Sequence, residues 1–174
     1  MLRATLTLLA ALACLAGGAR AQSATEEEVK AAFLYKFPAF VEWPERPPAA
    51  FVIAVADAED VASELARLSE GRDILGRRVM VKPLRKGESA AGAQVLFVGR
   101  ESARLAELAR SVAGTPVLVV SESPGALDQG SLVNFVLLEG RVRFEVALDS
   151  AERNGLRISP RLLALATRVR ASRR

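Results

Sequence analysis

Hydrophobic and polar residues follow two different periodicities along this chain, and these periodicities predict helices and strands in turn. The first helix is predicted over 26–41, where Thr25 to Glu28 form a capping box. Its apolar stripe recurs at three- and four-residue spacing, at Val29, Ala32, Phe33, Phe37 and Phe40. Pro38 is expected to kink or end this helix, because proline lacks a backbone N–H and clashes with the preceding turn.

Short apolar runs and amphipathic segments alternate over the next eighty residues. The apolar runs predict strands at 51–56, 77–83, 94–98 and 116–120. Helices are expected at 57–70, with Asp57 as its cap, and at 101–111. Strands that alternate with helices usually pair in parallel, so this part of the chain predicts an α/β sheet.

The last forty residues have a different pattern. Leu132–Leu138 and Arg141–Leu148 are predicted strands, and Glu139-Gly140 between them indicates a β-hairpin. A short helix should follow from Asp149, and Ser159-Pro160 should start a last helix. The apolar side of that helix is expected to hold Leu162, Leu163, Leu165, Ala166 and Val169. The predicted fold class is α/β: one domain with a mixed sheet of about six strands flanked by helices, ending in a β-hairpin and a helix.

The first 21 residues have the three parts of an export signal. Arg3 gives a positive start, 6–16 is an apolar run, and Ala19 to Ala21 offers the small residues that signal peptidase accepts. The run is too short for a membrane-spanning helix. A lipoprotein anchored at Cys14 would need a large aliphatic residue where Ala11 stands. We therefore predict a signal peptide over 1–21, cleavage after Ala21, and a periplasmic domain over 22–174.

After removal of this segment the chain contains neither histidine nor cysteine. Those two residue types perform most acid–base catalysis, thiol chemistry and transition-metal binding. A Ser-Lys or paired-carboxylate site has no supporting motif, and helix capping or solvation explains the carboxylates. The sequence predicts a binding protein rather than an enzyme, with no cofactor and no metal.

Charge adds little to this interpretation. The formal net charge of +4 falls to +2 when Arg3 and Arg20 are removed, which does not suggest a nucleic-acid partner. Arginines gather toward the end of the chain, at Arg157, Arg161, Arg168, Arg170, Arg173 and Arg174. They fit either a solvated face and tail or a contact with anionic lipid headgroups or an acidic partner.

Five of the nine aromatic residues lie between Phe33 and Trp43. One helical stripe cannot bury them all, because Tyr35 points away from Phe33 and Phe37. Two interpretations remain open. Most of these rings belong to the core, or some of them form an apolar surface patch for a partner or for self-association.

Two blocks of the sequence resemble the YfiR-like periplasmic family. The first comprises 29–37 and 40–44. The second comprises 134–136, 140–146, Ala151, 155–159, Leu162-Leu163 and Ala166. The resemblance extends over nearly the whole predicted mature chain.

This resemblance implies an exported α/β regulator without catalytic residues. In the founding case the partner is an inner-membrane diguanylate cyclase, whose periplasmic sensor part is bound so that cyclic-di-GMP synthesis stays low. An outer-membrane lipoprotein sequesters the repressor, and some relatives are paired with sensor histidine kinases instead. The disulfides of the founding member have no counterpart here, so redox control is not expected.

Three partner-binding surfaces are predicted, together with a homodimer. They are an apolar patch of Phe37, Phe40 and Trp43, a strand face with Arg143 and Glu145, and the start of the last helix with Leu156, Ile158 and Arg161. Core burial or an ordinary solvated face explains each set at least as well, and a homodimer face would account for one of them. Competing hypotheses are a periplasmic small-ligand receptor, which would use the crevice at the carboxyl ends of the strands, and a hydrolase with an unusual Ser-Lys or carboxylate site.

Overall fold

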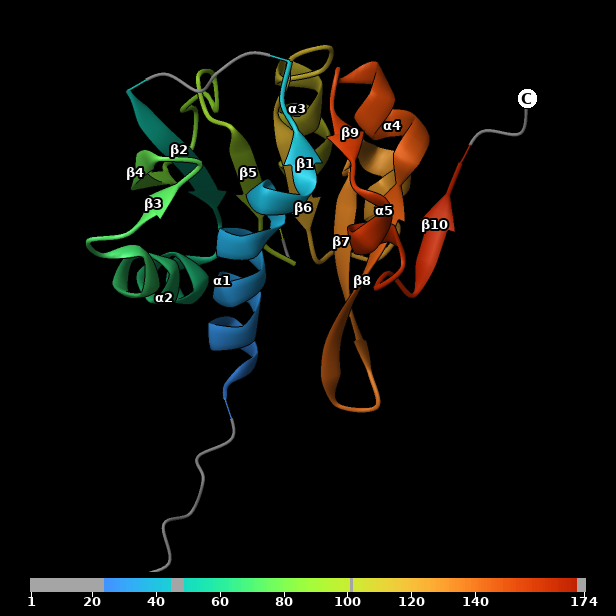
Figure 1. Ribbon diagram of the computed structural model, residues 1–174, viewed down its shortest axis with the longest axis horizontal. Helices are drawn as coiled ribbons and strands as arrows, with labels where there is room; N and C mark the ends of the chain where they lie inside the picture. The colour runs from blue at the N-terminus through green and yellow to red at the C-terminus, as the bar shows by residue number, and fades with distance from the viewer. Residues whose placement is uncertain (1–23, 45–48, 101, 172–174) are drawn as a thin grey trace, which may run out of the picture.

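A computed structural model describes residues 24–44, 49–100 and 102–171. The predicted export signal, 1–21, lies outside these residues. The main sheet has eight strands in the order β10-β8-β7-β6-β5-β2-β4-β3, and β1 and β9 form a separate pair (Figure 1). The strands are β1 Val41–Glu42, β2 Ala50–Ala56, β3 Asp73–Ile74, β4 Arg77–Leu84, β5 Val95–Val98, β6 Leu118–Ser121, β7 Val133–Leu138, β8 Arg141–Ala147, β9 Arg157–Ile158 and β10 Arg168–Arg170.

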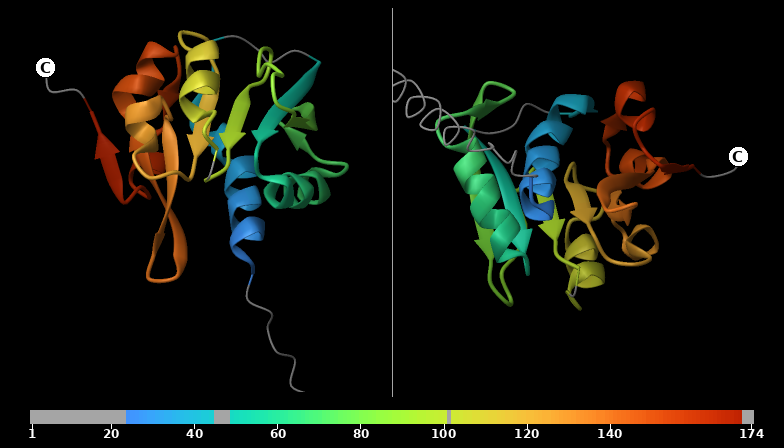
Figure 2. Two further views of the ribbon diagram at one scale, coloured as in Figure 1. Left: turned by 180° about the vertical axis from the view of Figure 1, so that it is seen from behind. Right: turned by 90° about the horizontal axis from the view of Figure 1, so that it is seen from below.

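The helices flank the central strands of this sheet. They are α1 Glu26–Lys36, α2 Glu59–Ser69, α3 Leu105–Ser111, α4 Leu148–Arg153 and α5 Pro160–Leu163, with 3-10 turns η1 Phe37–Phe40 and η2 Ala126–Gln129. Helices α1 and α2 cover one face of the sheet, and α3 covers the other (Figure 2). The mixed α/β class is confirmed. The sheet exceeds the expected six strands because short strands, such as β3 and β10, add to its edges.

The centre of the sheet is parallel, as the alternation of strands and helices predicts. Strand β2 pairs in parallel with β4 on one side and β5 on the other, and β5, β6 and β7 continue in parallel. The chain thus reverses its winding direction between β2 and β5. The predicted hairpin is present, with β8 antiparallel to β7.

The last helix is much shorter than predicted. Ser159 caps α5 as expected, since its hydroxyl accepts the Arg161 N–H, but the helix ends at Leu163. Leu165 is 64% exposed, and Val169 belongs to β10 rather than to a helix. Both apolar assignments were wrong. The backbone N–H of Thr167 donates to the Phe144 carbonyl, and strand pairing with β8 takes the place of further helical turns.

The first helix ends where Pro38 predicts. Helix α1 stops at Lys36, and η1 holds Pro38 in its first turn, where the missing N–H is not needed. Phe37 keeps α-helical backbone angles as the C-cap of α1, and its N–H donates to the Phe33 carbonyl, so the two rings lie on one face of the helix. The Phe37 ring stacks on Phe33 with centroids 5.5 Å apart and meets Phe144 edge-on at 5.2 Å. Phe135 joins from β7 at 5.8 Å from the Phe37 ring. This aromatic cluster joins α1 to the β7–β8 hairpin.

A second contact holds α1 on the sheet through charge. The Lys30 side chain is buried and reaches two carboxylates, Glu26 at 2.6 Å and Glu122 just after β6. Arg100 lies 3.2 Å from the same Glu26 oxygen. The hydrogen bond from Lys30, with the charges of Lys30 and Arg100, lowers the pKa of Glu26 despite partial desolvation.

We predict that Phe37→Ala lowers the free energy of unfolding by about 3–5 kcal/mol, because it leaves a cavity among the aromatic rings. Urea denaturation would measure this loss. Leu165→Ala is the matched control: its side chain is 64% exposed, so a change of less than about 0.5 kcal/mol is expected. Equal effects of the two substitutions would contradict the packing role of Phe37.

The lowered pKa of Glu26 predicts an acid-dependent loss of stability. Its contribution is complete above the ordinary pKa of 4.5 and disappears as the pH falls through the lower folded value. Denaturant unfolding measured between pH 3 and pH 7 should therefore show a steeper decline for the wild type than for Glu26→Gln. Parallel declines would show that the Lys30 contact does not favour the ionised carboxyl.

Candidate interaction surfaces

Three of the eight predicted partner-binding residues are buried. Phe37 is 1% exposed, Leu156 0% and Ile158 7%. Phe37 belongs to the aromatic cluster, and Leu156 and Ile158 belong to the hydrophobic core. The predicted apolar surface patch was wrong for Phe37, and burial also keeps Leu156 and Ile158, named for the start of the last helix, from contacting a partner in this conformation.

The two sequence blocks that are far apart in the chain meet at the small β1–β9 sheet. Val41 pairs with Ile158 and Glu42 with Arg157. The Ser159 N–H donates to the Phe40 carbonyl at 2.9 Å. The end of the aromatic segment and the start of α5 therefore form one continuous structure.

The two other aromatic candidates are half-buried. The Trp43 indole N–H donates to the Pro38 carbonyl at 3.3 Å, and its ring lies edge-on to Phe51 at 5.7 Å. Phe40 packs partly on the core and partly lines an open groove. Of the three residues in the predicted aromatic patch, Phe40 is therefore the one that lines this surface groove.

This groove lies between α1–η1 and the β3–β4 turn and has a volume of about 380 Å³. We call it the α1–β3 groove. Its apolar lining comes from Tyr35, Ala39, Phe40, Ile74 and Leu75, with Lys36 and Asp73 also contributing to it. The Tyr35 hydroxyl donates to the Asp73 carbonyl at 3.1 Å and joins the two walls.

Leu75 at the rim of the groove has an unusual backbone. Its φ is +51° and that of Gly76 is +71°, so both central residues of the tight β3–β4 turn are left-handed. Asn, Asp and Gly are preferred in such turns, and a leucine there costs about 1 kcal/mol. The side chain is nevertheless 50% exposed. A strained and exposed leucine suggests a role outside folding.

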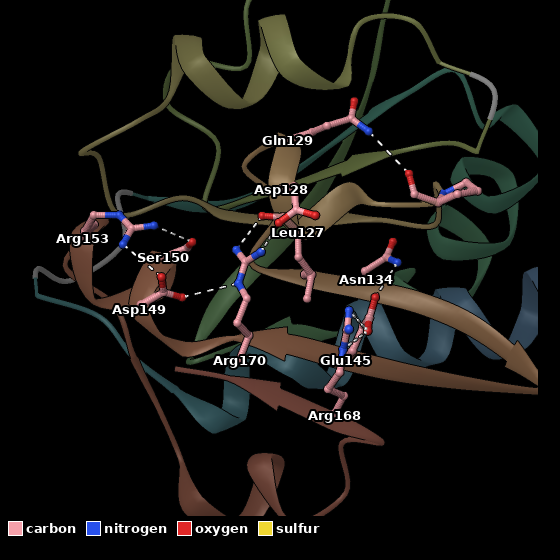
Figure 3. Close-up of polar contacts among 11 residues, drawn as sticks. Leu127, Asp128, Gln129, Asn134, Glu145, Asp149, Ser150, Arg153, Arg168 and Arg170 are labelled. Carbon is pink, nitrogen blue, oxygen red and sulfur yellow. Dashed lines mark hydrogen bonds and ion pairs between the residues drawn. The ribbon is translucent and has the colours of Figure 1, made fainter. Parts of the chain in front are cut away.

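The strand-face candidates differ in their environments. Arg143 is exposed, whereas Glu145 is half-buried and already engaged. One Glu145 oxygen accepts the Asn134 amide at 3.2 Å and the other accepts Arg168 at 2.7 Å, as Figure 3 shows. Glu145 therefore fixes β10 against the hairpin. Arg161 is exposed on α5.

Beside these contacts, Arg170 ties the end of β10 to η2 and the start of α4. Its guanidinium lies 2.5 Å from Asp128, donates to the Leu127 carbonyl at 2.6 Å, and lies 3.9 Å from Asp149 (Figure 3). The C-terminal arginines that the sequence left undecided thus have a structural role at Arg168 and Arg170.

The crevice at the carboxyl ends of the strands is closed at the winding reversal. The loops after β2 and β5 touch there, since a Cβ on Gly99 would lie 2.0 Å from the Asp57 carbonyl oxygen. Contrary to the prediction, the Asp57 carboxylate does not cap α2. It accepts a hydrogen bond from the Ser102 hydroxyl at 2.5 Å and forms an ion pair with Arg104 at 3.4 Å.

Within the described part of the chain, no cluster of His, Cys, Asp and Glu is suited to hold a metal ion.

Sequence reasoning missed the residues that form the second wall of the groove. Leu75-Gly76 connects strands β3 and β4 in the same way that Glu139-Gly140 connects β7 and β8. The sequence did not indicate this turn, because leucine is rarely found in tight hairpin turns. The buried Lys30 was also unforeseen, because its carboxylate partner Glu122 is 92 residues away in the chain. The sequence around Lys30 contains no information about a partner so far away in the chain.

Comparison with known proteins agrees with the two blocks seen in the sequence. Among the described residues, no helix has the length and apolarity that a bilayer crossing requires. A family model described as YfiR/HmsC-like matches residues 27–167, which includes both sequence blocks, the α1–β3 groove and the β7–β8 hairpin. The chain therefore belongs to the YfiR/HmsC-like family.

Proposed function

We propose that this protein is an exported regulator that represses an inner-membrane signalling protein, a diguanylate cyclase, by binding its periplasmic sensor region. The observation that supports this function is the family match over 27–167. The proposed location is the periplasm, after cleavage behind Ala21. We include a homodimer and sequestration by an outer-membrane lipoprotein in the same proposal.

Repression requires a difference in affinity between two states of the partner. A ligand shifts a conformational equilibrium only as far as it binds one state better than the other. The regulator would therefore bind the inactive form of the sensor region more tightly. Release by a competing protein then restores the active form without any chemical step in this domain.

The α1–β3 groove supports this proposal as one contact surface. It offers an apolar floor at Phe40 and Ile74 with an exposed leucine at its rim. Such a hollow fits an apolar side chain from the sensor region, and burial of Leu75 on binding would use the surface that folding leaves open.

Intracellular cyclic-di-GMP in a deletion strain tests the function directly. We expect a rise on deletion that is reversed by the full-length gene but not by a gene lacking residues 2–21. An unchanged level would argue against a cyclase as the partner. In that case, phosphotransfer by a sensor histidine kinase is the output to measure next.

We further predict that Leu75→Asn weakens repression without harming the fold. Asparagine tolerates the left-handed backbone, so the free energy of unfolding should stay unchanged or rise by about 1 kcal/mol. The cyclic-di-GMP level should nevertheless move toward that of the deletion. Leu165→Asn, at an exposed site outside the groove, is the control and should repress normally. Full repression by the Leu75 variant would remove the groove from the proposal.

A further inference from the structure

The β7–β8 hairpin extends beyond the rest of the sheet (Figures 1 and 2). In the described structure, β6 pairs with β7 at Val133 and Asn134. On the other side, β10 pairs with β8 from Glu145 to Ala147. Residues 135–144 therefore form a two-stranded ribbon without a third strand, and we call this segment the ribbon.

The ribbon has a fixed shape although it has open edges. At its base, Phe135 and Phe144 lie opposite each other and belong to the aromatic cluster. At its tip, Glu139 and Gly140 have φ values of +51° and +69°, the geometry that matches the twist of a tight hairpin. An isolated hairpin is only marginally stable, so the packing at the base is what holds the tip in place.

The tip exposes apolar side chains that folding does not use. Leu137 is 49% and Leu138 48% exposed, and they are two of the six large hydrophobic residues exposed in the described structure. Adjacent residues of a strand point to opposite faces, so the two leucines flank the tip on both sides. Apolar side chains gathered on a projecting element mark an interaction site.

One face of the ribbon adds positive charge to this apolar tip. Leu138 lies opposite Arg141, and Val136 lies opposite Arg143. Both arginines are exposed, and neither has a carboxylate partner among the described residues. The nearby Glu145 is already bonded to Asn134 and Arg168 (Figure 3). The face therefore presents two unneutralised guanidinium groups beside a leucine.

Two other occupants fit this face less well. A lipid bilayer would have to accept Glu139 at the apex of the ribbon, and a carboxylate is costly in the hydrocarbon region. A second copy paired along the open edge of β8 would bring the exposed arginines of the two copies close together, and like charges on neighbouring strands are destabilising. A protein surface with carboxylates avoids both penalties.

We propose that the ribbon docks on a protein partner whose surface carries carboxylates around an apolar pocket. Leu138 fills the pocket, and Arg141 and Arg143 pair with the carboxylates. The proposal rests on the proposed function in taking this partner to be the periplasmic sensor region, and it places a second contact apart from the α1–β3 groove.

Site-specific photo-crosslinking in intact cells tests the ribbon. The probe is p-benzoylphenylalanine at position 138 of the full chain, with a second probe at 165 as the control site. We expect a protein adduct at 138 and none at 165, with the crosslinked partner peptide mapped to a segment rich in Asp and Glu. The double variant Arg141→Glu, Arg143→Glu should reduce the adduct about tenfold. Lysine substitution of the mapped partner carboxylates should restore it.

The matched control is Arg85→Glu, Lys86→Glu, which makes the same change in net charge on exposed residues of another loop. It should leave the adduct unchanged, and thermal unfolding should confirm that every variant is folded. The proposal is overturned by the lack of an adduct at 138, by an adduct to lipid or to a second copy, or by a protein adduct that charge reversal does not reduce. A flat cyclic-di-GMP level beside a charge-dependent adduct would instead overturn the proposed function and leave the ribbon's role standing.

Discussion

The packing of α1 against the β7–β8 hairpin determines how this domain is assembled. Phe33 and Phe37 come from the start of the described chain, and Phe135 and Phe144 come from strands about a hundred residues later. Phe37 is still helical at the end of α1, so it lies on the same face as Phe33 and enters this cluster. Because the same cluster holds the base of the ribbon, a loss of packing under α1 would also release the projecting tip. Core stability and the proposed docking element therefore depend on one set of contacts.

The outermost strands of the sheet are short and charged, whereas the ribbon has open edges. Its outermost strands, β3 and β10, have only two and three residues, and β10 is held by the ion pairs of Arg168 and Arg170. Short, charged edges prevent unwanted strand pairing. The ribbon between them departs from that pattern, because it projects with open edges and exposed leucines. Open edges and exposed leucines on a projecting element point to a binding role for the ribbon.

Strain and exposure coincide at the α1–β3 groove as well. Leu75 keeps a left-handed backbone and a half-exposed side chain where asparagine or glycine would fold more easily. A sequence selected for stability alone would not retain this residue. The groove and the ribbon thus share one property: each leaves apolar surface exposed on a rigid support.

The sequence by itself determined the α/β class, most of the helices and strands, the end of α1 at Pro38 and the turn at Glu139-Gly140, because local periodicity and turn chemistry decide these features. The family followed from two blocks of residues. Only the tertiary structure decided that Phe37, Leu156 and Ile158 are buried, that Lys30 reaches Glu122, and that residues 168–170 form a strand rather than a helix. These outcomes depend on contacts between distant segments, and a local pattern carries no information about which distant segment will cover a given residue.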